Sequence, residues 1–268
     1  MRLLVLGDLH TGSTDSPRPP GVKLEDDDEM HAMDLGMNRV QKILMRSYRK
    51  MVEDVGHVDA CLVNGDSVDG KNDNGRGLGT WTTDIMKQCE VNIELLDMIK
   101  TDQWYMTNGS KYHVERNMSA DRYIARAFGA EFGSDLAIEL DKIHLHACHK
   151  TTYSSSTWYR TTPIAKELLV AELNRSEYGK FHILVRSHAH YYCFAGYGSS
   201  MGFITPCWKG RDAFAREQGL TMNPHLGYIL IETRGKGFSW VHVPVTLPKE
   251  CLIKYCRVKS KSSTSEPD

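Results

Sequence analysis

The sequence contains no long apolar run, and this absence excludes a membrane-spanning helix. No stretch of the 268 residues approaches the roughly 18 uninterrupted apolar residues that a membrane-spanning helix needs. The first ten residues also match a secretory signal peptide poorly, because their apolar part is short and is interrupted by Asp8. We therefore expect a cytoplasmic protein that does not associate with a membrane.

Paired cysteines and net charge are the other features that the sequence lacks. Its seven cysteines are scattered singly, without a Cys-x-x-Cys pair, which is typical of reduced thiols rather than of a disulfide framework. Lys and Arg together number 33 and Asp and Glu together 34, so a formal charge of -1 provides no broad basic surface for nucleic acid or anionic lipid. Any contact with nucleic acid must therefore be local.

The apolar residues alternate between short strands and amphipathic helices. Short apolar runs bounded by Gly, Pro or polar residues predict strands over residues 2–6, 60–63, 104–107, 136–140, 143–147, 181–185, 202–204, 227–232 and 238–243. Apolar residues spaced three and four apart predict helices over residues 37–55, 85–99, 121–128 and 163–173. Residues 11–34 and 70–80 predict long loops. The order of elements predicts one α/β domain over residues 1–258 and a disordered tail over residues 259–268.

Side chains that can bind metal follow four of the predicted strands, and they include several of the 12 histidines. They are Asp8 and His10, Asp66, His149, and His188 with His190. We expect these groups to converge, because ligands of open α/β sheets bind beyond the carboxyl ends of the strands. In an extended segment, Asp-x-His and His-x-His each place both side chains on one face. Carboxylates and imidazoles without thiolates suit Mn, Fe, Zn or a similar first-row ion.

Three ordered motifs make the sequence similar to the calcineurin-like metallophosphoesterases. They stand at residues 7–10 (GDLH), 65–69 (GDSVD) and 187–190 (SHAH), the last with Ser where the family has Gly. The resemblance spans roughly residues 1–245 and is closest to a branch of phosphoesterases encoded by phages and prophages. It implies a four-layer α/β/β/α sandwich in which two mixed β-sheets are flanked by helices.

Two family motifs are altered or ambiguous in this chain. Where the family has Gly-Asn-His, residues 107–113 read TNGSKYH, so the ligand is either the amide of Asn108 or a group at Ser110, followed by His113. We prefer Ser110, because the strand should end at the glycine. Residues 143–149 (IHLHACH) offer three histidines for one ligand position; we choose His149, at the expected end of the strand, with His146 as the alternative.

The resemblance also implies a reaction and its cofactors. Two divalent metal ions are expected, Mn²⁺ first, with Fe, Zn, Ni, Co or Mg as alternatives. One ion would take Asp8, His10 and His190, the other would take His149 and His188, and the two oxygens of Asp66 would bridge them. A hydroxide that bridges the ions would then attack phosphorus. His113 would protonate the leaving oxygen, and Asp69 would orient His10.

The expected substrate is a phosphoester, with a phosphodiester such as nucleic acid or a nucleotide favoured. Lys150, Arg160 and Arg186 are candidate phosphate-binding residues, because they flank or follow the ligand-bearing strand ends. The alternatives are a phosphomonoesterase or protein phosphatase, and a non-catalytic binding protein with the same fold. The oligomeric state stays open, and the location would be the host cytoplasm if a phage encodes the protein.

Four aromatic residues lie in or beside polar loops and have two interpretations. Trp81, Tyr153, Trp158 and Tyr159 could stack on a base of the substrate, or they could close the hydrophobic core. We expect the second role for each of them, because aromatic residues near loops more often close a core.

Overall fold

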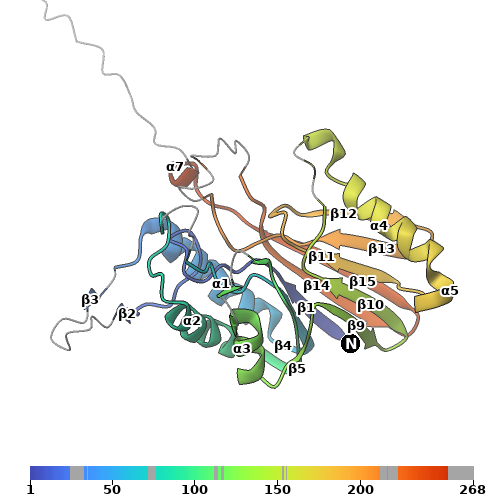
Figure 1. Cartoon of the computed structure of the whole chain (residues 1–268), viewed down its shortest axis with the longest axis horizontal. Helices are drawn as coiled ribbons and strands as arrows, with labels where there is room; N and C mark the ends of the chain where they lie inside the picture. Colours follow the sequence, from blue (N-terminus) through green and yellow to red (C-terminus); the bar gives the residue numbers. More distant parts are fainter. Residues whose placement is uncertain are drawn as a thin grey trace, which may run out of the picture.

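A computed structural model of the 268-residue chain shows two β-sheets packed face to face between helices (Figure 1). The structure describes residues 1–24, 33–34, 36–71, 77–111, 114–115, 118–152, 154, 156–211, 216 and 223–252. The tail predicted over residues 259–268 lies outside these residues.

The first sheet has six strands in the order β15-β14-β1-β4-β5-β8. Strands β1, β4, β5 and β8 are parallel to one another, and β14 and β15 complete the sheet in antiparallel fashion. Their bounds are β1 Arg2–Leu6, β4 His57–Asn64, β5 Lys100–Thr107, β8 Glu131–Gly133, β14 Leu226–Arg234 and β15 Gly237–Val245. The carboxyl ends of the four parallel strands therefore share one edge.

The second sheet has five strands in the order β12-β13-β11-β10-β9. Its three central strands, β10, β11 and β13, are parallel, and β9 and β12 are antiparallel edge strands. The bounds are β9 Asp135–Leu140, β10 Ile143–Cys148, β11 Ile183–Arg186, β12 Cys193–Tyr197 and β13 Ser200–Ile204. Two further pairs are short: β2 Lys23–Leu24 with β3 Met33–Asp34, and β6 Val114–Glu115 with β7 Met118–Ser119.

Helices cover the outer face of each sheet, which gives four layers (Figure 1). The six-stranded sheet is covered by α1 Arg39–Val55, α2 Ile85–Asp97 and α3 Ala120–Ala127. The five-stranded sheet is covered by α4 Thr162–Leu173, which α5 Arg175–Tyr178 follows. A one-turn 3-10 helix, η3 Thr157–Tyr159, precedes α4, and α7 Lys249–Leu252 follows β15. The architecture is the α/β sandwich of two mixed sheets and flanking helices that was expected.

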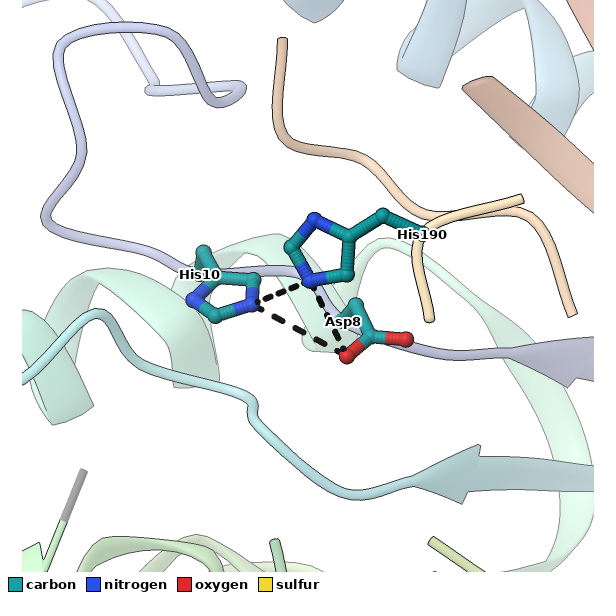
Figure 2. Close-up of side chains that lie close together, drawn as sticks. All are labelled: Asp8, His10 and His190. Atoms are coloured by element: carbon teal, nitrogen blue, oxygen red, sulfur yellow. Dashed lines mark hydrogen bonds and ion pairs between the residues drawn. The ribbon is translucent and has the colours of Figure 1, made fainter. Parts of the chain in front are cut away.

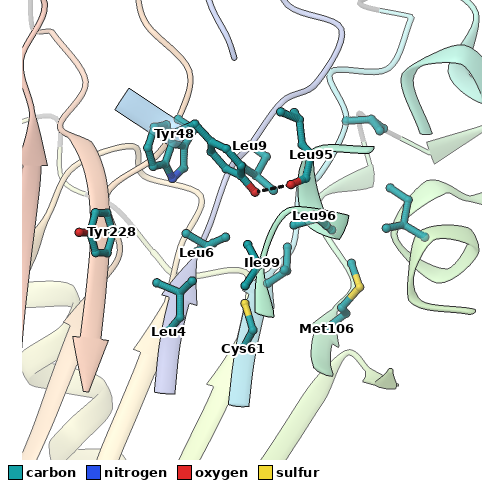
Figure 3. Packing of buried hydrophobic residues seen from close by; sticks show 14 of the residues in the cluster. Leu4, Leu6, Leu9, Tyr48, Cys61, Leu95, Leu96, Ile99, Met106 and Tyr228 are labelled. Carbon is teal, nitrogen blue, oxygen red and sulfur yellow. Dashed lines mark hydrogen bonds between the residues drawn. The ribbon is translucent and has the colours of Figure 1, made fainter. Parts of the chain in front are cut away.

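The central strands are apolar on both faces because both faces are buried. Leu3 and Val5 of β1 point between the sheets, where they join a core that includes Val185 and Phe203. The alternate residue Leu4 points toward the helices. On that side, the hydroxyl of Tyr48 in α1 donates a hydrogen bond to the carbonyl of Leu95 in α2, 3.1 Å away (Figure 3). Close packing on both faces holds these strands in place, and with them the loops that follow their carboxyl ends.

Several predicted elements differ from the observed ones. The stretch over residues 11–34, predicted as a loop, contains the short pair β2 and β3. The strands β8 and β12 were not predicted, and β4 and β5 are longer than their apolar runs. The six cysteines in the described part of the chain are free, as expected. No described helix combines the length and the apolar character that crossing a membrane requires.

Candidate metal centre

The loops that follow β1, β4, β10 and β11 meet at the ends of these strands. The backbone N–H groups of Asp8 and His10 donate to the carbonyls of Gly65 and Asp66 at 3.1 and 3.0 Å, so the loop after β1 stays attached to the loop after β4. The N–H of Ser187 donates to the carbonyl of His149 at 2.9 Å, which joins the other two loops. These bonds hold residues from distant parts of the sequence within reach of one another.

The first group of ligand-type side chains is Asp8, His10 and His190, called here the Asp8 trio (Figure 2). The Nε2 atoms of His10 and His190 are 3.0 Å apart. The Oδ1 atom of Asp8 is 3.8 Å from His10 Nε2 and 3.4 Å from His190 Nε2. One carboxylate oxygen and two ring nitrogens therefore face a common point, and Asp8 and His10 are buried.

The second group is Asp66, His149 and His188, called here the Asp66 trio. The Oδ2 atom of Asp66 is 3.1 Å from Nε2 of His149 and 4.0 Å from Nδ1 of His188. The two trios are linked, because the backbone N–H of His188 donates to Oδ2 of Asp8 at 3.0 Å. The described part of the chain thus contains two adjacent clusters with ligands of the same types.

The backbone brings these side chains together in a way that the sequence analysis did not anticipate. Six non-glycine residues in the described ranges have a positive φ, and five of them are Asp8 (52°), His10 (47°), Asp66 (52°), His188 (70°) and His190 (54°). Asp-x-His and His-x-His therefore have left-handed residues rather than an extended backbone, so the expectation of extended segments was wrong, while the expected convergence at the strand ends is observed. Such conformations are unfavourable for non-glycine residues and are found where a site requires them.

Two glycines allow the loops to approach the trios closely. Gly65 has a φ of +75°, and a Cβ atom there would lie 2.6 Å from Nδ1 of His149. A Cβ atom on Gly109 would overlap Oδ1 and the backbone nitrogen of Asp66. A side chain at either position would displace a member of the Asp66 trio.

His10 is held by the carboxylate of Asp69, as the resemblance implied. The Nδ1 atom of His10 is 3.1 Å from Oδ1 of Asp69 and must carry the proton, because a carboxylate only accepts. Asp69 also accepts from Nζ of Lys209 at 2.7 Å and from the hydroxyl of Thr80 at 3.2 Å. Burial alone would raise the pKa of Asp69, but the hydrogen bond from His10 and the ammonium of Lys209 hold this pKa well below its usual range.

His149 is held by a backbone carbonyl. Its Nδ1 donates to the carbonyl oxygen of Asn64 at 2.8 Å, which leaves Nε2 to face Asp66. The side-chain amide of Asn64 donates to the hydroxyl of Ser187 at 2.8 Å and accepts from the hydroxyl of Thr107 at 2.8 Å, so three strand ends meet there. His146 lies elsewhere, with Nδ1 3.1 Å from the guanidinium of Arg186. The structure thus places His149, and not His146, in the trio.

Asp66 uses its two oxygens for different purposes. Oδ1 accepts from the backbone N–H of Ser110 at 2.6 Å, and Oδ2 faces the two histidines. Each carboxylate oxygen has two lone pairs, so the single hydrogen bond from Ser110 leaves Oδ1 able to accept a cation as well.

The two alternative ligands of the altered family motif, Asn108 and Ser110, lie in different environments. The Asn108 side-chain oxygen accepts from the hydroxyl of Ser119 at 2.7 Å, so this amide is engaged away from the trios. The hydroxyl of Ser110 is buried and has no hydrogen-bond partner among the described residues. His113, the expected proton donor, lies outside the described residues.

Three buried or half-buried residues near the centre were missed by the sequence analysis. Lys209 follows β13, another strand end, and Asn64 is the last residue of β4. Asp121 in α3 accepts from the backbone N–H groups of Ser67 and Gly109 at 3.0 and 2.8 Å. Burial and the neighbouring carboxylate of Asp66 raise the pKa of Asp121. A search of every strand end would have found Asn64, whereas Lys209 lies beyond the end of β13 and no sequence signal marks Asp121.

The candidate phosphate-binding residues are in three different environments. Arg186 is buried and pairs with Glu167, with 2.5 Å between Nε and Oε2, so it belongs to an ion-pair network and not to the centre. The guanidinium of Arg160 lies 4.7 Å from the centre of the Tyr191 ring. Lys150 is exposed and directly follows His149.

The chemistry of the two trios fits divalent cations. Because Nδ1 of His10 and of His149 each donates a hydrogen bond, their Nε2 atoms carry lone pairs in the neutral form, and these face other lone pairs or carboxylates. Oδ1 of Asp8 and Nε2 of His149 are buried and make no hydrogen bond of good geometry. Lone pairs that face each other repel, so a proton or a cation has to lie between these acceptor atoms. The pKa of His149 in the metal-free protein shows the need for a positive group at this position. Burial alone would lower this pKa, but the carboxylates of Asp66 and Asp8 outweigh burial and raise it to about 9.

Comparison with known proteins shows distant likenesses. No family model and no curated protein matches the sequence. A single mutant of Vps29 from Entamoeba histolytica is 14% identical, with a TM-score of 0.46, over 92% of this chain and 100% of the other. An archaeal phosphodiesterase is 9% identical, with a TM-score of 0.47, over 91% and 100%. A protein from Streptococcus pneumoniae described as a predicted phosphoesterase is 12% identical, with a TM-score of 0.41, over 91% and 88%. At such distances, the chemistry of the centre has to be argued from its own residues.

Proposed function

We propose that the chain is a dinuclear metal-dependent phosphoesterase that hydrolyses a phosphodiester, such as a nucleotide or a nucleic acid. The observation that carries the proposal is the pair of adjacent trios, each with one carboxylate and two imidazoles, linked by the bond from the His188 N–H to Asp8. The D-x-H and G-D-x-x-D motifs and the His-x-His pair support it by their resemblance to metallophosphoesterases. We place the enzyme in the cytoplasm, or in the host cytoplasm if a phage encodes it.

In this proposal each trio holds one divalent ion. Mn²⁺ suits a set of carboxylate and imidazole ligands, and Fe, Zn, Ni, Co and Mg are the alternatives. Bound ions of this kind acidify water and neutralise charge on phosphoryl oxygens.

The residues around the trios have separate tasks. Asp69 fixes the proton of His10 on Nδ1, and the carbonyl of Asn64 does the same for His149, so both Nε2 atoms stay available as ligands. Lys150, exposed beside His149, binds the phosphate of the substrate. His113 is proposed to protonate the leaving oxygen, a role that usually contributes about 10²- to 10⁴-fold in rate.

A second candidate is a non-catalytic binding protein with the same fold. It is favoured by one observation, the engagement of the Asn108 amide by Ser119, which leaves the Asp66 trio without an amide ligand. A phosphomonoesterase or protein phosphatase is the alternative within the enzymes.

Turnover of two simple substrates separates these functions. We expect Mn²⁺-dependent hydrolysis of bis-p-nitrophenyl phosphate to exceed that of p-nitrophenyl phosphate and to stop when a chelator is added. The reverse preference would indicate a phosphomonoesterase. If neither ester is hydrolysed in a metal-dependent way, the non-catalytic binding protein is the function that remains. Asp66→Asn should abolish turnover while the circular dichroism spectrum stays unchanged.

A further inference from the structure

The segment between β10 and α4 exposes two aromatic side chains, contrary to the expectation that they close the core. Trp158 and Tyr159 lie in the short helix η3, and 88% of Trp158 and 63% of Tyr159 are accessible to solvent. Two consecutive residues thus present large aromatic side chains to solvent. No other large apolar residue with a described side chain is as exposed as Trp158.

Each end of this segment is connected to a residue that neighbours a ligand of the metal centre in the sequence. It begins directly after the ligand His149. At the other end, the hydroxyl of Tyr191, the residue after the ligand His190, donates to the carbonyl of Arg160 at 3.3 Å. The Arg160 guanidinium also lies over the Tyr191 ring, with 4.7 Å between its central carbon and the ring centre. These contacts hold the end of η3 against the residue that follows a member of the Asp8 trio.

The composition of the segment indicates what it can bind. Apart from Tyr153, Trp158, Tyr159 and Arg160, residues 151–162 are all Ser or Thr, so the segment itself contributes aromatic rings and hydroxyl groups but no aliphatic side chain. A flat ring in polar surroundings suits stacking with another flat ring. With a formal charge of -1, the chain also needs a source of affinity other than long-range attraction to phosphates.

We infer that Trp158 and Tyr159 form a stacking platform for a nucleobase of the substrate. This inference rests on the proposed function and names its substrate class as nucleotide-containing phosphodiesters. Arg160 then acts as a positioning residue that holds the platform against Tyr191, instead of binding the phosphate directly as expected from the sequence. Lys150, at the start of the same segment, supplies the cation for the phosphate next to the stacked base.

The test compares substrates with and without a base. The dinucleotide thymidylyl-thymidine is a phosphodiester with two bases, and glycerophosphocholine is a phosphodiester with no aromatic ring. For Trp158→Leu we expect KM for the dinucleotide to rise by at least about tenfold with kcat little changed, because stacking acts on binding. Trp158→Phe retains an aromatic ring and should stay within about threefold of the wild type. KM for glycerophosphocholine should not change in either variant.

A matched control removes an exposed aromatic residue far from the centre. Tyr197 ends β12, and the antiparallel pairing with β13 places it at the end of the sheet away from the trios. Tyr197→Leu should leave both KM values unchanged.

The outcomes separate this inference from the proposed function. Turnover of both substrates with no effect of Trp158→Leu on the dinucleotide would overturn the platform and leave the phosphoesterase intact. An equal effect on both substrates would also overturn it, because the loss would not involve the base. If neither substrate is hydrolysed, turnover of bis-p-nitrophenyl phosphate decides the proposed function, and equilibrium dialysis of the dinucleotide decides the platform. The platform is supported if the dinucleotide binds the wild type, Trp158→Phe and Tyr197→Leu alike but binds Trp158→Leu more weakly. Equal binding to all of them, no binding to any, or binding of a protein in place of the dinucleotide excludes the platform.

Discussion

The two trios present the same ligand types, but they are supported differently. In the Asp8 trio, His10 is backed by the charged carboxylate of Asp69, whose own partner is Lys209. In the Asp66 trio, His149 is backed by a neutral carbonyl, and the distances from the carboxylate oxygen to the two rings are 3.1 and 4.0 Å. A carboxylate partner makes an imidazole a stronger ligand than a carbonyl does.

This difference predicts unequal affinity for two identical ions. The Asp8 trio should bind the first ion, and the Asp66 trio should bind the second more weakly. The amide that would complete the Asp66 trio is also engaged, because Asn108 accepts a hydrogen bond from Ser119. Calorimetric titration of metal-free protein with Mn²⁺ should therefore resolve two classes of site, and the following changes test which trio is which.

The largest effects should come from removing one histidine from each trio. His190→Ala should abolish the tight class and His188→Ala the weak class, and each should lower phosphodiester turnover by at least about 100-fold, since loss of a ligand should cost at least as much as loss of its supporting partner. Calorimetry and metal content by mass spectrometry measure the classes. His144→Ala, which removes an exposed histidine outside both trios, is the control and should change neither. If both ligand variants lost the same class, the assignment of two separate trios would be wrong.

Asp69→Asn should weaken the tight class by about 10- to 100-fold while the weak class keeps its affinity. An amide can still accept the hydrogen bond from His10, but it lacks the charge that strengthens the ligand. Asp102→Asn is a suitable control, because Asp102 also pairs with a histidine, His57, at the exposed surface. A uniform loss of affinity in both classes would indicate that Asp69 supports the fold of the whole centre rather than one trio.

Gly65→Ala should act on the weak class, by about tenfold or less, because the new methyl group would press against His149. A positive φ also makes the substitution unfavourable by about 1–2 kcal/mol regardless of contacts. Gly56→Ala isolates this second effect, since Gly56 has a φ of +62° and no atom within 4 Å of the added Cβ. Both variants should melt at lower temperature, and only Gly65→Ala should change metal binding. Unchanged metal affinity in Gly65→Ala would contradict the close packing of the glycine on His149.

The smallest effect is a pH dependence of the metal-free protein. The pKa of His149 rises from about 6.5 when unfolded to about 9 in the fold, since the Asp66 and Asp8 carboxylates outweigh the effect of burial. Its stabilising contribution is complete below pH 6.5 and is lost as the pH rises through 9. The melting temperature should thus fall by a few degrees between pH 6.5 and 9.5 without metal. Added Mn²⁺ should stabilise more as the pH rises, because the ion replaces the proton. If the melting temperature of the metal-free protein did not change with pH, the contact between His149 and Asp66 would be contradicted.

Much of the fold followed from the sequence, because the best-predicted elements are those with strong local signals. The strand β1 is apolar on both faces, and α1 carries its apolar stripe at helical spacing and begins after a capping box at Asn38. The strand β8 has only three residues, and β12 contains Gly196, so neither has a pattern of its own. Both are formed by pairing with neighbouring strands, which a local pattern does not show.

The members of the two trios were predictable, but the geometry that joins them was not. Their positions at strand ends pointed to one edge of the sandwich. The left-handed turns at Asp8 and His10 could not be located from the sequence, because Asp and His adopt this conformation more often than most residues but the surrounding loops decide where they do so. Lys209 stands 140 residues after its partner Asp69, so their contact depends entirely on the assembled fold.

One bond described above has a wider consequence. The His188 backbone N–H holds Asp8 of one trio, while its ring faces Asp66 of the other. Any movement of this residue is therefore felt in both trios at once. Whatever effect an ion in one trio has on the other trio through this residue, linkage requires that effect to be reciprocal. One residue thus belongs to both halves of the centre, by its backbone to one and by its ring to the other.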